Sequence, residues 1–220
     1  MDTKEKILSA AIEVFAEKGK HGTRMEEIAV RASVNKAMLY YFFTTKEKLF
    51  QEVLITALFR ISKRITDGIT QQIDAMTDPR DKVTLIVNKH FDAYSQSSDE
   101  TNILLSSMTT CPADVEKAAK KIAEEHPAVF CPEKFVSFFE ECKATKLFRN
   151  IDPRQTLVSI VGMNLIYFAA KPISQLLLNI NVNNEQEFLK ERQASIVDLI
   201  LHGILTDPEP PHTTKPGSVL

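Results

Sequence analysis

The sequence predicts an all-α protein with about nine or ten helices. Apolar residues recur at spacings of three and four through most of the chain, which is the period of a helix that buries one face. Only 6 of the 220 residues are glycine, and this scarcity argues against β architectures with many tight turns. With 44% hydrophobic and 25% charged residues, the chain has the composition of a folded globular protein.

The first two helices are indicated by signals at their ends. Asp2 and Glu5 fit a capping box at the start of an amphipathic helix, and Gly19 is expected to end that helix. Thr23 and Glu26 have the same capping-box spacing, so they are expected to open a second helix of about two turns.

A third short helix completes a predicted helix-turn-helix domain over residues 1–47. Ser33 forms part of the tight turn, and Asn35 is a favourable N-cap for the helix that follows. Apolar residues of all three helices are expected to hold this third helix so that its polar face stays on the surface. They are Phe15, Ile28, Val34, Leu39 and Phe43.

A long fourth helix is predicted to begin at Lys46 and to connect this domain with a second helical domain over residues 48–206. Its apolar stripe continues to Ile65, and Asp78-Pro79 ends the segment. Later breaks are expected at Cys-Pro, His-Pro and Asp-Pro pairs, because proline disfavours helical backbone in the residue before it. The remaining helices are expected at about 80–97, 101–110, 113–126, 132–146, 153–179 and 185–206.

Composition also bears on location and on the C-terminal end. The N-terminus has no signal-peptide pattern, and Cys111, Cys131 and Cys142 form no C-x-x-C pair, which together predict a reducing, cytoplasmic compartment. The apolar stretch Leu157–Ile180 contains several polar residues and fits a buried helix better than a membrane span. Residues 207–220 contain 4 of the 10 prolines and are predicted to be disordered.

Charge and missing motifs narrow the function. Residues 1–50 carry a small excess of Lys and Arg over Asp and Glu, whereas the rest of the chain is net acidic. Gly-rich phosphate loops, serine-nucleophile motifs and His-x-x-x-His spacing are not found, so no cofactor and no metal are predicted. From spacing alone, a DNA-binding helix-turn-helix and a small helical bundle with an ordinary polar surface remain about equally favoured.

A resemblance decides between these two alternatives. Residues 22–50 read GTRMEEIAVRASVNKAMLYYFFTTKEKLF and resemble the DNA-binding segment of the tetracycline-repressor (TetR) family of bacterial transcription regulators. The preceding KILSAAIEVFAEKG is similar to the first helix of that family. The resemblance covers about the first 50 residues and implies that residues 35–41 form a recognition helix. The predicted DNA-binding residues are Thr23, Arg24, Asn35, Lys36, Ala37, Met38, Tyr40, Tyr41, Thr45 and Lys46.

The resemblance also implies separate roles for these residues. Thr23 and Lys46 are expected to contact phosphates. Lys36 and Met38 are expected to face the major groove, where base edges carry the sequence information. Tyr40 is expected to support the recognition helix and to reach a phosphate.

Four positions depart from the family pattern. Arg24 stands where a small hydroxyl residue is common, and Met38 replaces a frequent Thr or Ala. Lys48 stands where a Glu often completes a capping box, so Thr44 with Glu47 is an alternative cap for the fourth helix. Ser33 occupies the usual turn glycine, so a left-handed backbone there would be strained.

The rest of the chain resembles the family more loosely, in KATKLFRNIDPRQTL and FAAKPISQLLL. This looser resemblance implies a variable helical domain that binds a small molecule and forms a homodimer through its last two helices. The predicted ligand pocket comprises His90, Phe91, Tyr94, Leu104, Met108, Phe135, Phe138, Phe139, Asn164 and Tyr167. The predicted dimer interface comprises Leu157, Ile160, Val161, Leu165, Phe168, Ile196, Leu199, Ile200 and Gly203.

Several of these residues have a simpler interpretation. Most of the aromatic side chains could be ordinary core, and His90 and Asn164 could form hydrogen bonds within the core instead of orienting a ligand. Oxidation sensing by the cysteines is a rival to small-molecule sensing, although buried cysteines without a redox role are more common.

The hypothesis from sequence is a homodimeric transcriptional regulator, most often a repressor in this family. A small-molecule effector would release it from palindromic double-stranded operator DNA, and it would have no membrane partner. The rival hypothesis is an α-helical enzyme or carrier for a small apolar molecule.

Overall fold

A computed structural model describes residues 2–129, 132–179 and 184–206 of the chain. Within these ranges all regular secondary structure is helical, apart from one isolated bridge between Phe148 and Leu205. The predicted all-α class is therefore confirmed, and the described part has slightly more helices than expected. They are α1 (Thr3–Gly22), α2 (Met25–Arg31), α3 (Lys36–Phe42), α4 (Lys46–Thr70), the 3-10 helix η1 (Ile73–Ala75), α5 (Pro79–Gln96), α6 (Ser98–Thr110), α7 (Pro112–Glu125), α8 (Pro132–Ala144), α9 (Pro153–Ala169), α10 (Lys171–Leu177) and α11 (Glu185–Ile204).

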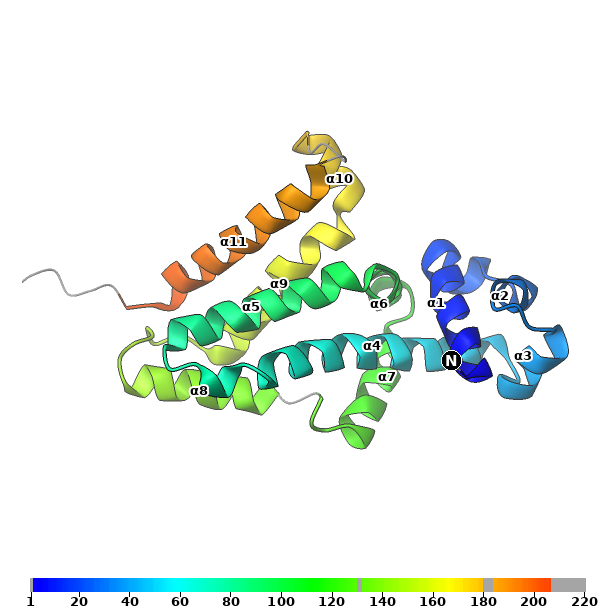
Figure 1. Ribbon diagram of the computed structural model, residues 1–220, viewed down its shortest axis with the longest axis horizontal. Coiled ribbons are helices and arrows are strands. Elements are labelled where there is room, and N and C mark those ends of the chain that lie inside the picture. The colour runs from blue at the N-terminus through cyan, green and yellow to red at the C-terminus, as the bar shows by residue number, and fades with distance from the viewer. Residues whose placement is uncertain (1, 130–131, 180–183, 207–220) are drawn as a thin grey trace, which may run out of the picture.

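The molecule is elongated, with two parts joined by α4. Figure 1 shows α1, α2 and α3 grouped at one end, which we call the head. The α4 helix begins at the head and runs through the rest of the molecule, the body, where α5, α6 and α7 pack against it, α9 and α11 pack against α5, and α8 packs against α9. The predicted boundary between residues 47 and 48 thus falls in the first turn of α4. Residues 207–220, predicted to be disordered, lie outside the described part.

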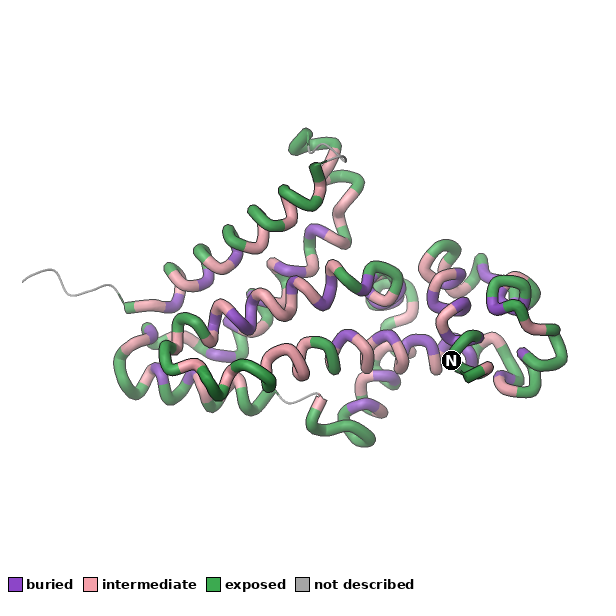
Figure 2. Tube along the Cα trace, viewed as in Figure 1, coloured by how far each residue is buried: buried purple, intermediate pink, exposed green. Residues whose placement is uncertain are grey.

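Two hydrophobic clusters hold these parts together. The first joins the head to the first half of α4, where the rings of Phe15 and Phe50 meet edge to face with centroids 5.1 Å apart. The second lies in the body and includes Phe139, Ile160 and Ile196. Figure 2 shows the buried residues on the faces where helices meet. Because α4 contributes to the first cluster over several turns, the head is packed onto α4 instead of hanging from a loop.

The helix predicted over residues 153–179 is instead two helices. The α9 and α10 helices are bent by 77° at a break beside Ala170. Pro172 explains the break, because its ring has no N–H to donate and collides with the carbonyl one turn earlier. Among the described residues, no single helix is long and apolar enough to cross a membrane, and α9 and α10 meet that test only as a bent pair.

The connection between α1 and α2 follows the prediction only in part. Gly19 has a φ of 69°, so the regular helix is interrupted there as predicted, and a further helical turn that is counted with α1 extends to Gly22. Arg24, not Thr23, is the N-cap of α2. The hydroxyl of Thr23 instead donates a hydrogen bond to the carbonyl oxygen of Gly19 at 2.8 Å, and the carbonyl oxygen of Val14 lies 3.3 Å away. Thr23 therefore acts as an internal tie across the irregular end of α1.

Other predicted helix starts are confirmed. The N–H of Asp2 donates to the Glu5 carboxylate at 3.1 Å, as the capping box requires. Thr45 is the N-cap of α4, because its hydroxyl oxygen accepts from the N–H of Lys48 at 3.2 Å. The alternative cap at Thr44 is not the one formed.

The turn between α2 and α3 contains the left-handed residue that the sequence suggested. Ser33 has a φ of 54°, and its N–H donates to the carbonyl of Val30 at 3.0 Å. The next N–H, of Val34, donates to the carbonyl of Ala29 at 2.9 Å. These hydrogen bonds fix the backbone in a region that costs a residue with a Cβ about 1–2 kcal/mol.

We expect Ser33→Gly to raise the free energy of unfolding by up to about 1 kcal/mol, because glycine adopts positive φ without steric cost. Thermal unfolding should show a melting temperature about 2–4 °C higher than that of the wild type. The control is Ser106→Gly in the middle of α6, where glycine should lower the melting temperature. A melting temperature that is unchanged or lower for Ser33→Gly would contradict the proposed strain.

Candidate DNA-binding surface and ligand cavity

The α3 helix is anchored on one side and exposed on the other. Leu39 is fully buried and Phe43, at the end of the helix, is 3% exposed. The side-chain oxygen of Asn35 accepts from the N–H of Met38 at 2.7 Å, which caps the helix as predicted. The outward residues are the predicted set of Lys36, Ala37, Met38, Tyr40 and Tyr41, all exposed. A seven-residue helix thus presents a continuous polar and aromatic face on a rigid base.

Cations and helix-start groups flank this face. The ammonium of Lys46 donates to the carbonyl oxygen of Thr23 at 3.0 Å, which places the start of α4 beside the N-cap of α2. Arg24 is exposed at that N-cap, and Thr45 is exposed at the N-cap of α4. Within the described ranges, neither Arg24 nor Lys46 has a carboxylate within 4.0 Å. Their charges are therefore available to a phosphate, and so are the first N–H groups of α4.

The cations on the far side of the head are neutralised instead. Arg31 donates to the carboxylates of Glu13 and Glu17 at 3.1 and 3.0 Å, and Lys18 pairs with Glu27 at 2.9 Å. The Glu17 hydrogen bond holds the pKa of Arg31 above its ordinary range, so the guanidinium remains charged and paired. Arg31 and Lys18 are thus less available to a phosphate than Arg24 and Lys46.

Lys36 lies on the exposed face of α3, which we call the contact face, and unlike Arg24 and Lys46 it is paired with a carboxylate. Its ammonium lies 2.5 Å from the carboxylate of Glu26, and both side chains are more than half exposed. The hydrogen bond that Lys36 donates to Glu26 raises the pKa of Lys36, and the ammonium also lies 5.8 Å from the ring centre of Tyr40. Contact between Lys36 and a base edge would therefore require the exposed Glu26 pair to open, which costs little in water.

The side chain of Thr23 does not share this exposure. It is 2% exposed, and its hydroxyl is committed to the Gly19 carbonyl. In this arrangement its contribution to the contact face is its backbone carbonyl, which positions Lys46. Sequence alone does not separate a hydroxyl that faces a phosphate from one that ties two helices together.

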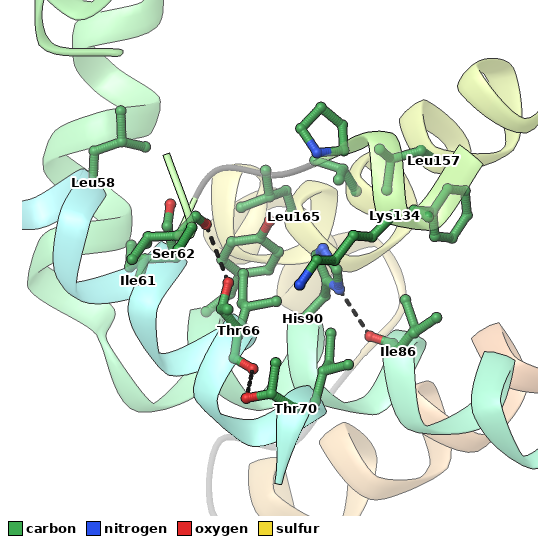
Figure 3. A pocket seen from close by; sticks show the side chains of 18 of the residues that line it. Leu58, Ile61, Ser62, Thr66, Thr70, Ile86, His90, Lys134, Leu157 and Leu165 are labelled. Carbon is green, nitrogen blue, oxygen red and sulfur yellow. Dashed lines mark hydrogen bonds between the residues drawn. The ribbon is translucent and has the colours of Figure 1, made fainter. Parts of the chain in front are cut away.

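The body contains an apolar cavity of about 560 Å³. Figure 3 shows its walls, which come from α4, α5, α8 and α9 with further residues from α6. This volume is in the range of cavities that bind small molecules. Six predicted pocket residues line it: His90, Tyr94, Leu104, Met108, Phe135 and Phe138.

Four other predicted pocket residues lie elsewhere. Phe91 and Phe139 are buried in the second hydrophobic cluster. Asn164 is fully buried and its amide donates to the Ile160 carbonyl at 2.8 Å. The hydroxyl of Tyr167 donates to Glu185 at 3.1 Å, which fixes the base of α11. For these four residues the interpretation as core is the one that fits.

The α4 helix supplies a wall that the sequence prediction missed. Its lining residues recur at spacings of three and four, and this spacing predicts a helix face buried in a core as well as one that lines a cavity. Hydroxyl residues in that stripe were the available signal, because Ser62, Thr66 and Thr70 follow one another at single turns. The α4 lining residues are Leu58, Ile61, Ser62, Ile65, Thr66, Ile69 and Thr70.

His90 is a half-buried titratable side chain in the cavity wall. Its Nδ1 lies 2.8 Å from the carbonyl oxygen of Ile86, so Nδ1 carries the hydrogen and Nε2 keeps its lone pair. Burial lowers the pKa of His90, and the hydrogen bond to Ile86 opposes this shift only in part. His90 is therefore a neutral imidazole with one acceptor nitrogen.

The predicted dimer residues are divided among three environments. Leu157, Val161 and Leu165 line the cavity, while Ile160, Ile196 and Ile200 are buried in the second hydrophobic cluster. Phe168 packs against Phe91, with the two ring centroids 5.7 Å apart. Leu199 is 54% exposed, and Gly203 has no heavy atom within 4 Å of the place where a Cβ would lie. The exposed apolar residues on these helices include two that were not predicted, Val158 and Ile166 on α9.

The described cysteines show no sign of redox or metal chemistry. Burial raises the pKa of the Cys142 thiol, which disfavours the reactive thiolate. Cys111 is partly buried, and Cys131 lies outside the described residues. Among the described residues, no group of three or more His, Cys, Asp and Glu side chains is arranged to hold a metal ion.

We expect the enclosed His90 to make folding stability depend on pH. Below its ordinary pKa of 6.5 the unfolded chain takes up the proton before the folded protein does, so the free energy of unfolding should fall as the pH decreases. His90→Gln removes this titration and should reduce the loss of stability between pH 7 and pH 5 in urea unfolding. His202→Gln, at an exposed position on α11, is the control. An unchanged pH profile for His90→Gln would contradict the assignment.

Comparison with known proteins identifies the head. Residues 7–53 match the family model of bacterial regulatory proteins, tetR family. The chain is 35% identical over 92 residues to the HTH-type transcriptional activator FasR of Mycolicibacterium smegmatis, which covers 42% of this chain and 40% of FasR. It is 48% identical over 52 residues to the HTH-type transcriptional repressor NicS of Pseudomonas putida, or 24% of each chain. These matches span less than half the length of either relative.

The fold is similar over nearly the whole chain. The crystal structure of the transcriptional regulator FadR from Bacillus subtilis in complex with stearoyl-CoA has a TM-score of 0.65 and 16% sequence identity, and the match covers 91% of this chain and 98% of that one. At this identity the comparison establishes the fold. Residues 7–53 are thus similar to the tetR family of bacterial regulatory proteins, and the helices of the chain are arranged as in a solved transcriptional regulator.

Proposed function

We propose that the protein is a homodimeric transcriptional repressor that a small apolar effector releases from operator DNA in the cytoplasm. The observation that carries the proposal is the outward face of α3, flanked by the unpaired cations Arg24 and Lys46 on a rigidly packed head. The matching family model over this segment supports a DNA-binding use of that face.

The head has the geometry that a helix in the major groove needs. Lys36, Ala37 and Met38 lie in the first turn of α3, which is the part of a recognition helix that contacts base edges. Arg24, Thr45 and Lys46 lie at the starts of α2 and α4, where side chains and backbone N–H groups contact phosphates. We assign sequence recognition to the first group and positioning to the second.

The α6 and α7 helices connect the cavity to the head, which they meet at α1 and at the first turns of α4. The α6 helix lines the cavity and leads into α7 at Cys111. Asp114, in the first turn of α7, accepts a hydrogen bond from Lys20 of α1 at 2.6 Å, and its carbonyl accepts from Gln51 of α4 at 3.2 Å. A ligand that displaces α6 would move this junction and thus change the orientation of the head. This is how we propose that effector binding and operator binding are coupled.

A dimer would cover the exposed apolar residues of α9 and α11. Val158 and Ile166 lie two turns apart on α9 and are 68% and 57% exposed. Gly162 lies between them, and no heavy atom occurs within 4 Å of the place for its Cβ, so a second helix can approach closely. Leu199 and Gly203 form a similar exposed pair on α11. A two-fold dimer through this surface would present two α3 helices to one palindromic site.

The names of the relatives support regulation more than catalysis. FasR is named as an activator and NicS as a repressor, so relatives of both signs exist. The stearoyl-CoA in the Bacillus subtilis FadR structure shows that this fold accommodates a long apolar ligand. We therefore favour an effector cavity over the rival interpretation as an enzyme or carrier.

The DNA-binding proposal is tested by titrating the pure protein with DNA from beside its own gene. We expect Lys46→Ala to weaken binding to all DNA sequences alike and to reduce the magnitude of the slope of log K against log salt by about 1–2 for a dimer, because a phosphate contact is lost from each subunit. Lys120→Ala on α7, where Lys120 pairs with Glu116, is the control and should leave the slope unchanged. A full salt slope with altered sequence preference for Lys46→Ala would overturn its assignment.

The dimer proposal is tested with Leu199→Glu. The substitution would bury two opposed carboxylates, so light scattering should show a folded monomer and operator affinity should fall by roughly tenfold or more. Val30→Glu is the control for oligomeric state, because Val30 is an exposed apolar residue of the head. A dimeric Leu199→Glu variant with intact operator affinity would place the interface elsewhere.

A further inference from the structure

We infer that the effector is a linear anionic amphiphile whose carboxylate pairs with Lys134 and whose apolar chain extends toward α6. The inference rests on the proposed function only in treating the cavity as the effector site. Three features of the cavity lead to it: its length along α4, the charged groups in its wall, and the apolar end toward α6.

The cavity is elongated because one helix lines it over several turns. Lining residues of α4 occur from Leu58 through Thr70, and η1 continues the wall at Ile73. Thr70 follows Leu58 by 12 positions within α4, and at the helical rise of 1.5 Å per residue this corresponds to ~18 Å. A space of this length beside a straight helix favours a chain-like ligand over a compact ring system.

Only two lining side chains in the described part carry a full charge. They are Lys134 on α8 and Asp74 on η1, and His90 is neutral. The hydroxyls of Thr66, Thr70 and Thr101 are already committed to backbone carbonyls. Lys134 and Asp74 are therefore the two groups that determine which charge on a ligand head is favoured.

Lys134 and Asp74 contact different parts of the wall. Thr66 donates to the carbonyl oxygen of Val129 at 3.1 Å, so Val129 lies against the middle of the α4 wall. Asp74 lies beyond the end of α4. Figure 3 shows the Lys134 side chain reaching over the cavity from α8. Lys134 has no carboxylate within 4.0 Å in the described ranges, so its ammonium is available to an anion.

The position of Asp74 then decides the direction of the chain. An anionic head at Lys134 is repelled by Asp74, and an apolar chain gains nothing beside a carboxylate. On the other side of Lys134 the wall is made of aliphatic side chains and one methionine. They are Leu58, Ile61, Leu104, Leu105, Met108 and Leu165. Burial of an apolar chain against these residues is favourable in proportion to the area removed from water.

This direction also explains how such a ligand would act on the head. Leu104, Leu105 and Met108 belong to α6, and α6 packs directly against α1. The far end of the chain would therefore press on the helix that contacts the head. A longer chain should reach further along α6 than a shorter one.

The test is isothermal titration calorimetry of the full chain without DNA, using octanoate, dodecanoate, hexadecanoate and the matching alcohols as probes. We expect dodecanoate to bind roughly tenfold or more tightly than dodecanol, because hydrogen bonds to charged groups are worth about 1.5–3 kcal/mol. Lys134→Met should remove this difference and Lys134→Arg should keep it. Lys143→Met on the same helix is the control, because Lys143 pairs with Glu140 outside the cavity.

The direction of the chain is tested by filling either end. Leu105→Trp should weaken hexadecanoate binding more than octanoate binding, and Ile73→Trp should leave both unchanged. Should Leu105→Trp fail to fold, Leu105→Phe gives a smaller form of the same effect. Weaker binding in Ile73→Trp with none in Leu105→Trp would overturn the direction.

Three results would overturn the ligand class. They are equal affinity for dodecanoate and dodecanol, no binding of any carboxylate, and binding of dodecanoyl-CoA with no binding of dodecanoate. The last result would show that a phosphate-bearing head, not a carboxylate, is recognised. Because these titrations contain no DNA, their failure leaves the DNA-binding proposal intact, and that proposal fails only if operator DNA is not bound.

Discussion

The continuity of α4 is the constraint on which the rest of the structure depends. Its first turn carries Lys46, which donates to the carbonyl oxygen of Thr23 in the head, its second places Phe50 in the core beneath α1, and its remaining turns form a cavity wall. A helix of 25 residues is about 37 Å long and behaves as one rigid element. We propose that a displacement at the cavity wall is transmitted to the head along this helix, and that the contacts of α7 with α1 and α4 at Asp114 guide the orientation of the head.

Several cations of the head are paired with carboxylates, so the number of basic residues alone does not show which charges are available. The net excess of basic residues in the first 50 positions is small, and composition alone gives it little weight. The structure shows why the excess matters locally. Arg31, Lys18 and Lys20 are held by carboxylates away from α3, whereas Arg24 and Lys46 beside α3 are not. A phosphate that approaches the starts of α2 and α4 therefore meets two cations, Arg24 and Lys46, that have no carboxylate within 4.0 Å among the described residues.

Local signals in the sequence were enough to predict most of the helices and the cap of α3, because capping, periodicity and turn chemistry are decided by neighbouring residues. Asn35 caps α3 and Ser33 takes the left-handed backbone, as expected. Predictions that depend on which neighbour a side chain meets were less complete. The hydroxyl of Thr23 faces its own helix, and three residues of the predicted dimer band line the cavity. Because apolar residues occur on all sides of α9, their pattern does not indicate which side meets a core, a cavity or a partner.

The claim that α3 reads operator DNA through the major groove is tested most directly by methylation interference on a bound DNA fragment. If the account is correct, methylation of guanine N7 in the major groove should abolish binding at two groups of positions separated by one helical turn or a multiple of it, about 10 base pairs per turn. Methylation of adenine N3 in the minor groove at the same positions should have little effect. Interference confined to adenine N3, or no interference at guanine N7 in any bound site, would contradict it.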